Sequence, residues 1–285
     1  MSANSKPKTL NNNQWIRDAS EELANAGIAT ARLDAEIILA HTIHRSRTWI
    51  HAHGNELLDA RRIEIANARL ALRLDRVPVA YIIGHKEFYG RIFKVTPSTL
   101  IPRPESESVI ELLKRHLPQH AATLVDIGTG SGCLGITAKL ELPQLSVTLS
   151  DVSHYALKVA ASNAETLGAE VATVRSNLFA EFHLPNTVFD CIIANLPYVD
   201  IAWERSPETD HEPHEALFAE DGGFALIGRL LTQAHSHLSA GGLIVLEADP
   251  EQHQRIIESA HTHGLRHLES NGYGVALIRA FSHKD

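Results

Sequence analysis

A four-residue turn, Asn195-Leu-Pro-Tyr198, contains the side chains whose types and spacing point most directly to chemistry. It follows the largely apolar run 189–194, which is rich in β-prone residues and predicts a buried strand. Pro197 has no N–H to donate, and it favours an extended conformation at Leu196. The turn therefore presents three groups in a fixed arrangement: the Asn195 side-chain amide, the Leu196 carbonyl and the Tyr198 ring.

Two oxygens beside an aromatic ring suit a flat –NH2 group, which offers two hydrogens and two faces. A carboxamide has this shape, and so does the amino group of adenine. An ordinary turn after a buried strand explains the same four residues equally well. The rest of the chain therefore has to decide between a site and a turn.

A second candidate site is the glycine-rich turn after the predicted strand 123–127. A strand, a glycine turn and a helix in succession form a tight bend whose backbone N–H groups face a ligand. The turn consists of Gly128, Thr129, Gly130, Ser131 and Gly132. In a dinucleotide site the third glycine comes one residue later, where this chain has Cys133. Asp151 ends the next predicted strand and is placed to accept ribose hydroxyls, so we expect an adenosyl amino acid rather than a nicotinamide dinucleotide.

The composition excludes several classes of protein. The chain has 285 residues, enough for one large and one small domain, and a formal net charge of −8. It has no basic stripe of the kind that a nucleic-acid-coating surface requires, so we expect no direct binding of nucleic acid. No apolar run approaches membrane-spanning length, and the N-terminus lacks the apolar stretch of a signal peptide. We therefore expect a cytoplasmic protein with no membrane contact.

Neither the cysteines nor the histidines are spaced as metal ligands. Cys133 and Cys191 lie in apolar segments and predict buried thiols in a reducing compartment. The densest cluster of histidines and acids runs from His211 to Glu215, but Pro213 interrupts the helix that a zinc-binding H-E-x-x-H motif needs. We therefore expect no metal.

Hydrophobic patterning divides the chain into four parts. Residues 1–14 are polar and aperiodic and predict a loose tail. Residues 85–103 predict a β-hairpin around Gly90 that links two domains. Residues 15–84 form the first domain, which we expect to recognise the substrate. Its apolar side chains recur at helical spacing over about 15–26, 31–44 and 58–74.

The second domain, residues 104–285, alternates between predicted strands and helices. Such alternation is typical of an α/β domain with a doubly wound parallel sheet, whose sites lie at the carboxyl ends of the strands. Helices are expected at about 104–117, 133–140, 154–167, 224–238 and 251–263. Strands are expected at 123–127, 146–151, 171–175, 189–194, 242–248 and in a final antiparallel pair near 268 and 275–278.

Taken together, these motifs resemble those of the HemK/PrmC family of S-adenosyl-L-methionine-dependent methyltransferases. The resemblance covers nearly the whole chain. It rests on Glu87-Phe88 and Gly90, the run Leu-Ile-Pro-Arg-Pro-Glu-Ser-Glu over 100–107, Val125-Asp-Ile and the glycine turn that follows, Asp151, Asn195-Leu-Pro-Tyr-Val-Asp200, Glu212-Pro213 and Ala216-Leu217.

The resemblance implies a seven-stranded methyltransferase fold with a small N-terminal helical bundle. It also implies that the enzyme methylates the side-chain amide nitrogen of the glutamine in the Gly-Gly-Gln loop of peptide chain release factors. The cofactor-binding residues that it implies are Gly128, Thr129, Gly130, Ser131, Gly132, Asp151, Asn177, Leu178 and Asn195. The catalytic residues that it implies are Asn195, Leu196, Pro197 and Tyr198.

Two departures from the family pattern leave alternatives open. Leu196 stands where the family usually has a proline, and Asn177 stands where an acidic residue is common. The Asn-Leu-Pro-Tyr turn also resembles the motif of ribosomal RNA adenine dimethyltransferases. The alternatives are methylation of a glutamine in a large-subunit ribosomal protein and, ranked below it, methylation of the adenine amino group in nucleic acid.

Overall fold

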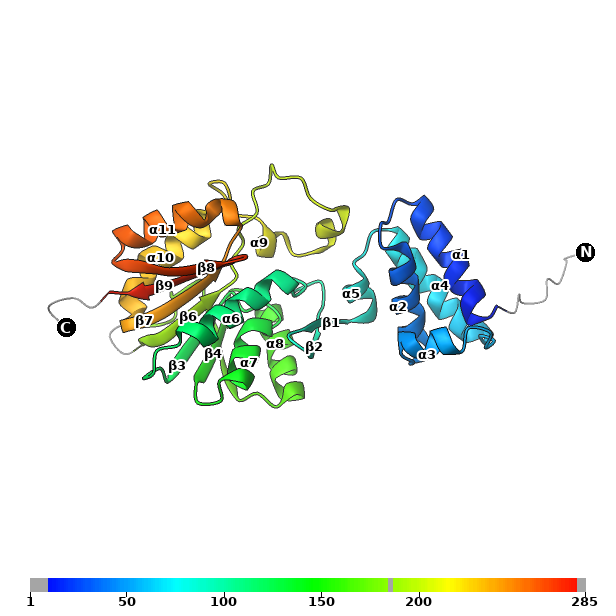
Figure 1. Ribbon diagram of the computed structural model, residues 1–285, viewed down its shortest axis with the longest axis horizontal. Helices are drawn as coiled ribbons and strands as arrows, with labels where there is room; N and C mark the ends of the chain where they lie inside the picture. The colour runs from blue at the N-terminus through cyan, green and yellow to red at the C-terminus, as the bar shows by residue number, and fades with distance from the viewer. Residues whose placement is uncertain (1–9, 184–186, 281–285) are drawn as a thin grey trace, which may run out of the picture. The chain divides into compact units, whose positions relative to one another are not determined.

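The computed structural model describes residues 10–183 and 187–280 (Figure 1). The chain divides into two compact units. The first comprises Met1–Gly84 and Ser206–His211, and the second comprises His85–Arg205 and Glu212–Asp285. A six-residue segment far along the sequence, 206–211, therefore packs with the N-terminal helices.

The first unit is a bundle of helices around one apolar core. Large side chains of that core include Trp15, Leu23, Ile38 and Leu39. The elements are α1 (Asn12–Asn25), α2 (Ala31–Ile43), α3 (Arg47–Ala52), α4 (Ala60–Leu74), α5 (Val79–Ile83) and the 3-10 helix η2 (Pro207–His211).

Helix α1 begins before the end of the predicted tail. The Asn11 side chain accepts a hydrogen bond from the Gln14 N–H at 2.8 Å, and the Gln14 side chain accepts one from the Asn11 N–H at 3.0 Å. This capping box starts the helix at Asn12, so the predicted tail 1–14 is wrong at its C-terminal end. Residues 1–9 of that tail lie outside the described residues.

Two of the helices in this unit escape the sequence pattern. The expected helices at 31–44 and 58–74 correspond to α2 and α4. Helices α3 and α5 contain six and five residues. These lengths are too short to show helical periodicity, so the pattern does not predict them.

The second unit begins with a two-stranded antiparallel hairpin, as the sequence predicts. Strands β1 (His85–Phe88) and β2 (Arg91–Lys94) pair directly on either side of Tyr89 and Gly90. The Phe88 and Phe93 side chains of this hairpin are buried in the core of the same unit.

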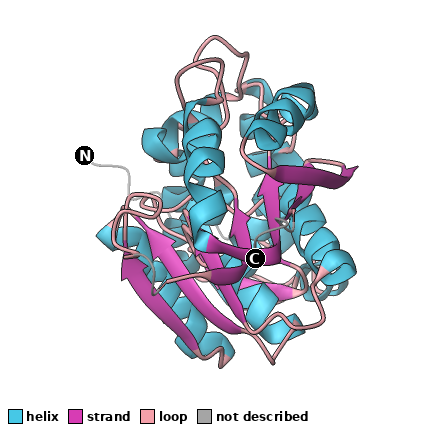
Figure 2. Ribbon diagram, turned by 90° about the vertical axis from the view of Figure 1, so that its left-hand side faces the viewer, coloured by secondary structure: helices cyan, strands magenta, loops and turns pink. Residues whose placement is uncertain are grey.

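A seven-stranded sheet forms the centre of the second unit, which confirms the predicted fold class (Figure 2). Its strands lie in the order β5-β4-β3-β6-β7-β9-β8. The first five are parallel, whereas β9 is antiparallel to both of its neighbours, as expected for the final pair. The strands are β3 (Thr123–Ile127), β4 (Ser146–Asp151), β5 (Val171–Arg175), β6 (Phe189–Ala194), β7 (Leu238–Glu247), β8 (Leu265–Asn271) and β9 (Gly274–Arg279).

Helices pack on both faces of this sheet. Ile127, Ile192 and Leu246 belong to one apolar cluster, which also contains residues of α10 (Ala225–His237) and α11 (His253–Thr262). The opposite cluster contains residues of α6 (Glu107–His116), α7 (Cys133–Glu141) and α8 (His154–Leu167). Alternate residues of the central strands thus face opposite layers, which explains why these strands read as continuous apolar runs.

Several element boundaries differ from those predicted. The predicted helix at 104–117 is a 3-10 turn, η1 (Pro104–Ser106), followed by α6. Strand β7 begins at Leu238 rather than at residue 242, because Leu238 pairs with Phe189 ahead of an irregularity in the register. The short elements α9 (His214–Leu217) and η3 (Pro250–Gln252) are not predicted.

The strand order creates a switch point between β3 and β6. From β3 the chain continues to β4 and β5 on one side, whereas from β6 it continues to β7 on the other. Ligands of such sheets bind outside the carboxyl ends of the strands at this point. Ile127 pairs with Ala194, so the glycine turn and the Asn-Leu-Pro-Tyr turn begin side by side.

Within residues 10–183 and 187–280, no helix has both the length and the apolar character needed to cross a bilayer.

Candidate active site

A cavity of about 1040 Å³, partly open to solvent, lies at the switch point. The glycine turn, Asp151 and the start of the Asn-Leu-Pro-Tyr turn all line it. The two motifs singled out in the sequence therefore meet in one cavity. A volume of this order accommodates a small-molecule cofactor.

The glycine turn is held by hydrogen bonds to strand β4. The N–H groups of Gly128 and Thr129 donate to the Ser150 carbonyl at 2.8 and 2.9 Å. The Gly130 N–H donates to Asp151 Oδ2 at 2.9 Å. Gly128 has a φ of 75°, and a Cβ added there would lie 3.0 Å from Leu196 Cδ2. Glycine is thus required both by the turn and by the close approach of the neighbouring motif.

Asp151 is nearly buried at the end of β4, with 9% of its surface exposed. Burial raises the pKa of its carboxyl, and hydrogen bonds from the Ser153 and Gly130 N–H groups partly offset this effect. These bonds fix the carboxylate at the cavity, where it is suited to accept hydroxyl groups from a ligand.

Asp126 is a cavity residue that the sequence analysis missed. Its Oδ2 accepts hydrogen bonds from the Thr129 hydroxyl at 2.6 Å and from the Gly135 N–H at 2.9 Å. Its Oδ1 is buried and accepts no hydrogen bond from any described residue. Burial raises the pKa of Asp126 to about 7. A buried acceptor without a donor suits the amino group of an adenosyl amino acid, so the donor set of the cavity fits this class of cofactor.

A recognisable signal for Asp126 exists in the sequence. It is the one acidic residue in the strand 123–127, where a buried apolar residue is otherwise expected. An acid at such a position requires a partner; the glycine turn supplies one donor, Thr129, and helix α7 supplies the other, Gly135.

Asn195 begins the turn that follows β6. Its side-chain Nδ2 donates to Ser106 Oγ at 3.3 Å. Neither its Oδ1 nor the Leu196 carbonyl accepts a hydrogen bond from the described residues. Asn195, Leu196 and Pro197 all line the cavity. The turn that lines the cavity therefore carries two acceptor oxygens that no described residue occupies.

The Leu196 side chain supports the turn from behind. It is 5% exposed and belongs to the apolar cluster that includes Ile127 and Leu246. Packing thus restrains this position, where the family usually has the stiffer ring of proline.

Tyr198 does not line the cavity. Its half-buried ring packs against the apolar cluster, and its hydroxyl donates to Glu247 Oε1 at 3.2 Å. Burial raises the pKa of Tyr198, so the phenol keeps its proton. The Tyr198 carbonyl accepts a hydrogen bond from Gln252 Nε2 at 3.0 Å. A Cβ added to Gly223 would lie 1.9 Å from the same carbonyl oxygen, so only glycine fits there.

Two further walls of the cavity come from segments that the sequence analysis did not assign to the site. Residues 98–103 contribute to the lining, and so do Pro213, Glu215 and Ala216. Glu212, 7% exposed, joins them by accepting a hydrogen bond from the Ile101 N–H at 3.0 Å and another from Arg103 Nη2. The Glu212-Pro213 motif therefore has a structural role in the cavity wall.

The remaining predicted site residues are distributed as follows. Asn177 and Leu178 line the cavity, whereas Gly132 does not. Asn177 Oδ1 accepts a weak hydrogen bond from Arg229 Nη2 at 3.5 Å. The contact of Asn177 and Leu178 with adenine stays a prediction, as do the roles of the other predicted cofactor and catalytic residues. Cys191 is buried as expected, but Cys133 is only half-buried and lines the cavity.

In the described part of the chain, no cluster of three or more histidine, cysteine or acidic side chains is arranged to hold a metal ion. In the cluster 211–215, Glu212 pairs with the backbone and Arg103, and His211 Nε2 lies 2.9 Å from the Asp75 carbonyl in the first unit.

The fold of the second unit is that of doubly wound α/β proteins with a seven-stranded sheet. A methyltransferase from Pyrococcus furiosus has a similar structure, with a TM-score of 0.50 and 19% identity over 75% of this chain and 98% of that chain. Residues 106–209 match the methyltransferase small domain, and residues 14–84 match the PrmC N-terminal domain.

Relatives named release factor glutamine methyltransferase are similar over most of their length. The protein from Koribacter versatilis is 36% identical, over 83% of this chain and 88% of the relative. The protein from Escherichia coli K12 is 31% identical, over 90% of this chain and 92% of the relative. The chain belongs to the release factor glutamine methyltransferase family, and it is an S-adenosyl-L-methionine-dependent methyltransferase.

Proposed function

We propose that this protein transfers a methyl group from S-adenosyl-L-methionine to the side-chain amide nitrogen of the glutamine in the Gly-Gly-Gln loop of a peptide chain release factor. Family membership supports this substrate class, because the similar relatives carry that activity in their names. Release factors act on ribosomes, so the proposed site of action is the cytoplasm.

The residues that would hold the cofactor are those of the glycine turn, Asp126 and Asp151. Asp126 Oδ1 has no donor and would take the amino group, while Asp151 would accept the ribose hydroxyls. Asn177 and Leu178 would flank the adenine. When bound, S-adenosyl-L-methionine supplies a methyl group that its positive sulfonium makes electrophilic.

The pair of free oxygens at Asn195 and Leu196 is the observation that carries the proposal. Each is placed to accept one N–H of a substrate amide. An amide nitrogen is a poor nucleophile because its lone pair is shared with the carbonyl. Two acceptors increase the electron density on the nitrogen and fix its rotation. Positioning of this kind lowers a barrier by about 7–11 kcal/mol in favourable cases.

Tyr198 is predicted to pack on the plane of the bound amide. Its ring packs against the apolar cluster next to the turn, and its hydroxyl is fixed by Glu247, so the ring is held in one orientation. No side-chain base is required before transfer, because the amide proton becomes acidic once the nitrogen is methylated. We therefore assign no histidine a role in proton removal.

Asn195→Ala tests this mechanism. We expect turnover of a purified release factor to be abolished, because the substrate nitrogen loses one acceptor. The Kd for S-adenosyl-L-methionine, measured by calorimetry, should stay within about tenfold of the wild-type value, since the glycine turn and Asp151 are untouched. Turnover at the wild-type rate would contradict the proposed role of Asn195.

A further inference from the structure

Behind the Asn-Leu-Pro-Tyr turn lies a buried carboxylate that the mechanism above does not use. We propose that Glu247 and Ser106 are positioning residues that fix the direction of the Asn195 amide, so that its Oδ1 faces the cavity. This inference rests on the proposed function, because the direction of that amide matters only for a substrate that presents N–H groups.

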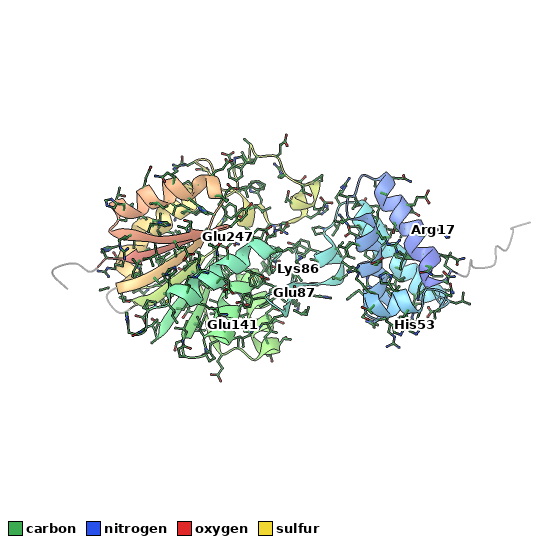
Figure 3. The ribbon with its side chains drawn as sticks, in the orientation of Figure 1. Arg17, His53, Lys86, Glu87, Glu141 and Glu247 are labelled. Atoms are coloured by element: carbon green, nitrogen blue, oxygen red, sulfur yellow. The ribbon has the colours of Figure 1, made fainter. Side chains whose placement is uncertain are left out.

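Glu247 is the last residue of β7, and 1% of its surface is exposed (Figure 3). It lies next to the turn because the preceding residue, Leu246, pairs with Ala194 at the end of β6. Its Oε1 accepts the hydrogen bond from the Tyr198 hydroxyl. Its Oε2 is buried and accepts no hydrogen bond of ordinary geometry from the described residues. One carboxylate oxygen is therefore occupied by the turn, and the other requires a donor.

The side chains of Ser106 and Asn195 are the donors available near that second oxygen. It ends the 3-10 turn η1 and is 1% exposed. Burial raises the pKa of Glu247, and the Ser106 hydroxyl lies close enough to lower it again. The same hydroxyl oxygen accepts the hydrogen bond from Asn195 Nδ2. Ser106 and Asn195 thus both lie close to the carboxylate and to each other.

The order of donors and acceptors along this chain is set at the carboxylate. When Glu247 is ionised its carboxylate can only accept hydrogen bonds, so the Ser106 hydroxyl and Asn195 Nδ2 both present hydrogens toward it. The oxygen of Ser106 can then only accept from Asn195. Nδ2 of Asn195 is the group that donates, and Oδ1 is left facing the cavity.

This direction discriminates between two substrate groups of nearly equal shape. Oδ1 accepts from the –NH2 of glutamine, whereas it repels the carboxylate oxygens of glutamate. If the Asn195 amide were rotated by half a turn, Nδ2 would face the substrate. The preference for glutamine over glutamate would then be reversed at this contact. Glu247 and Ser106 are therefore specificity-determining residues although neither donates to nor accepts from the substrate in this scheme.

Two variants break this hydrogen-bond network at different points. Glu247→Gln keeps the shape but offers one acceptor oxygen instead of two, so either Ser106 or Tyr198 loses its acceptor. Ser106→Ala removes the partner of Asn195 Nδ2 and one donor near Glu247, and leaves the hydrogen bond between Tyr198 and Glu247 in place. A matched control is Asp190→Asn, which makes the same change from carboxyl to amide near the other end of β6, where Asp190 binds Thr123 and Ser239.

The measurements separate positioning from stability. For each variant the kcat for a purified release factor, the Kd for S-adenosyl-L-methionine and the melting temperature are measured at about pH 8, which favours the ionised form of Glu247. The Kd of two release factors is then compared, one with glutamine and one with glutamate in its Gly-Gly-Gln loop. Their ratio reports the direction of the Asn195 amide without any turnover.

For Glu247→Gln and Ser106→Ala we expect a loss in kcat of about tenfold or more, because a buried polar group loses its partner. We expect the preference for glutamine over glutamate to shrink by a similar factor, with cofactor Kd within about threefold of wild type. Asp190→Asn should change neither kcat nor preference. A preference unchanged in both variants would overturn the inference, and so would a loss in Glu247→Gln that Ser106→Ala does not share. If the wild-type protein itself fails to methylate the release factor, the proposed function fails instead.

Discussion

Asp126 is the residue whose ionisation should control cofactor binding. Its pKa is raised from 3.8 to about 7 by burial, so the carboxyl loses its proton in the folded protein only near neutral pH. The ionised form would accept the amino group of the cofactor through the free Oδ1. We expect the affinity for S-adenosyl-L-methionine to rise as the pH increases through about 7, by about tenfold between pH 5.5 and pH 8.5.

The same shift predicts an opposite effect on stability. A folded-state pKa above the unfolded value means that stability from this group is present at low pH and is lost as the pH rises through about 7. Asp126→Asn should therefore raise the melting temperature of the cofactor-free protein at about pH 8 while weakening cofactor binding by about tenfold. Calorimetry and thermal unfolding at both pH values check this. An affinity that is independent of pH in the wild type would contradict it.

The Leu196 side chain restrains the turn by packing in the core, where a proline would restrain it with its ring. Its side chain is buried in the apolar cluster, and its N–H donates to no described residue, so a proline ring removes no hydrogen bond. For Leu196→Pro we expect turnover within about threefold of wild type, because the carbonyl acceptor remains. Stability should fall by about 1–2 kcal/mol, because apolar area is lost from the core. Urea unfolding measures the second effect; loss of turnover together with wild-type stability would show that the leucine has a direct catalytic role.

At the scale of single residues, the sequence predicted the groups that lie in motifs and missed those that reach the site by tertiary contact. The glycine turn, Asp151 and Asn195 sit at strand ends, where the alternation of strands and helices indicates a site. Ser106 and Glu247 each lie more than fifty residues from Asn195 along the chain, and no local pattern connects them. Tyr198 was expected at the cavity, but the ring turns toward Glu247 because its hydroxyl needs a buried acceptor.

Among the elements, the cavity wall formed by residues 98–103 depends on one buried carboxylate. Glu212 is the hydrogen-bond acceptor for both Ile101 and Arg103. For Glu212→Ala we expect a loss of about 1–3 kcal/mol in the free energy of unfolding, because a buried N–H is left without a partner. The KM for S-adenosyl-L-methionine should rise, because the wall loosens, and kcat should change less.

A comparison with Glu215→Ala controls for the loss of a carboxylate near the cavity. Glu215 also lines the cavity, but it accepts no hydrogen bond from residues in the described ranges. An equal rise in KM in both variants would indicate that charge, rather than the wall, determines cofactor binding.

Strands of this protein are more predictable than its short helices. The predicted limits of β3, β4 and β5 agree with the structure, because each is a short run rich in apolar or β-branched residues, buried in β3 and largely in β4 and mostly exposed in the edge strand β5. Helices such as α9, with four residues, carry no periodic signal. Their limits are set by tertiary contacts, which a local pattern does not contain.

At the scale of the whole molecule, a buried arginine ties a distant segment to the N-terminal helices. Arg73 is 5% exposed and pairs with Asp34 at 2.7 Å and with Glu208 at 2.9 Å, all within the first unit. Although burial raises the pKa of Glu208, hydrogen bonds from Ser206 and the Arg73 guanidinium hold it at about 2. No sequence pattern predicts this connection, because Glu208 lies in a loop of the second domain by sequence.

Arg73→Met should destabilise the first unit by about 3–5 kcal/mol, because the buried Asp34 carboxylate loses its cation and Glu208 loses one of its two arginine partners. The stability from Glu208 is present above its ordinary pKa of 4.5 and is lost as the pH falls toward about 2. Chemical unfolding at neutral pH measures the first effect. Arg32→Met, which removes an exposed partner of Glu36, should cost less than about 1 kcal/mol. Equal losses in the two variants would contradict the assignment of a buried ion pair.

The central claim is that the two oxygens at the end of β6 direct a methyl group onto a glutamine amide. The most direct test incubates the full-length protein with methyl-labelled S-adenosyl-L-methionine and three acceptors in turn: a release factor, ribosomal proteins and total RNA. We predict that the label enters the release factor alone, and that mass spectrometry places it on the glutamine of the Gly-Gly-Gln loop. Replacing that glutamine by alanine should remove the label. Label in the ribosomal proteins or in RNA, with none in the release factor, would contradict the account.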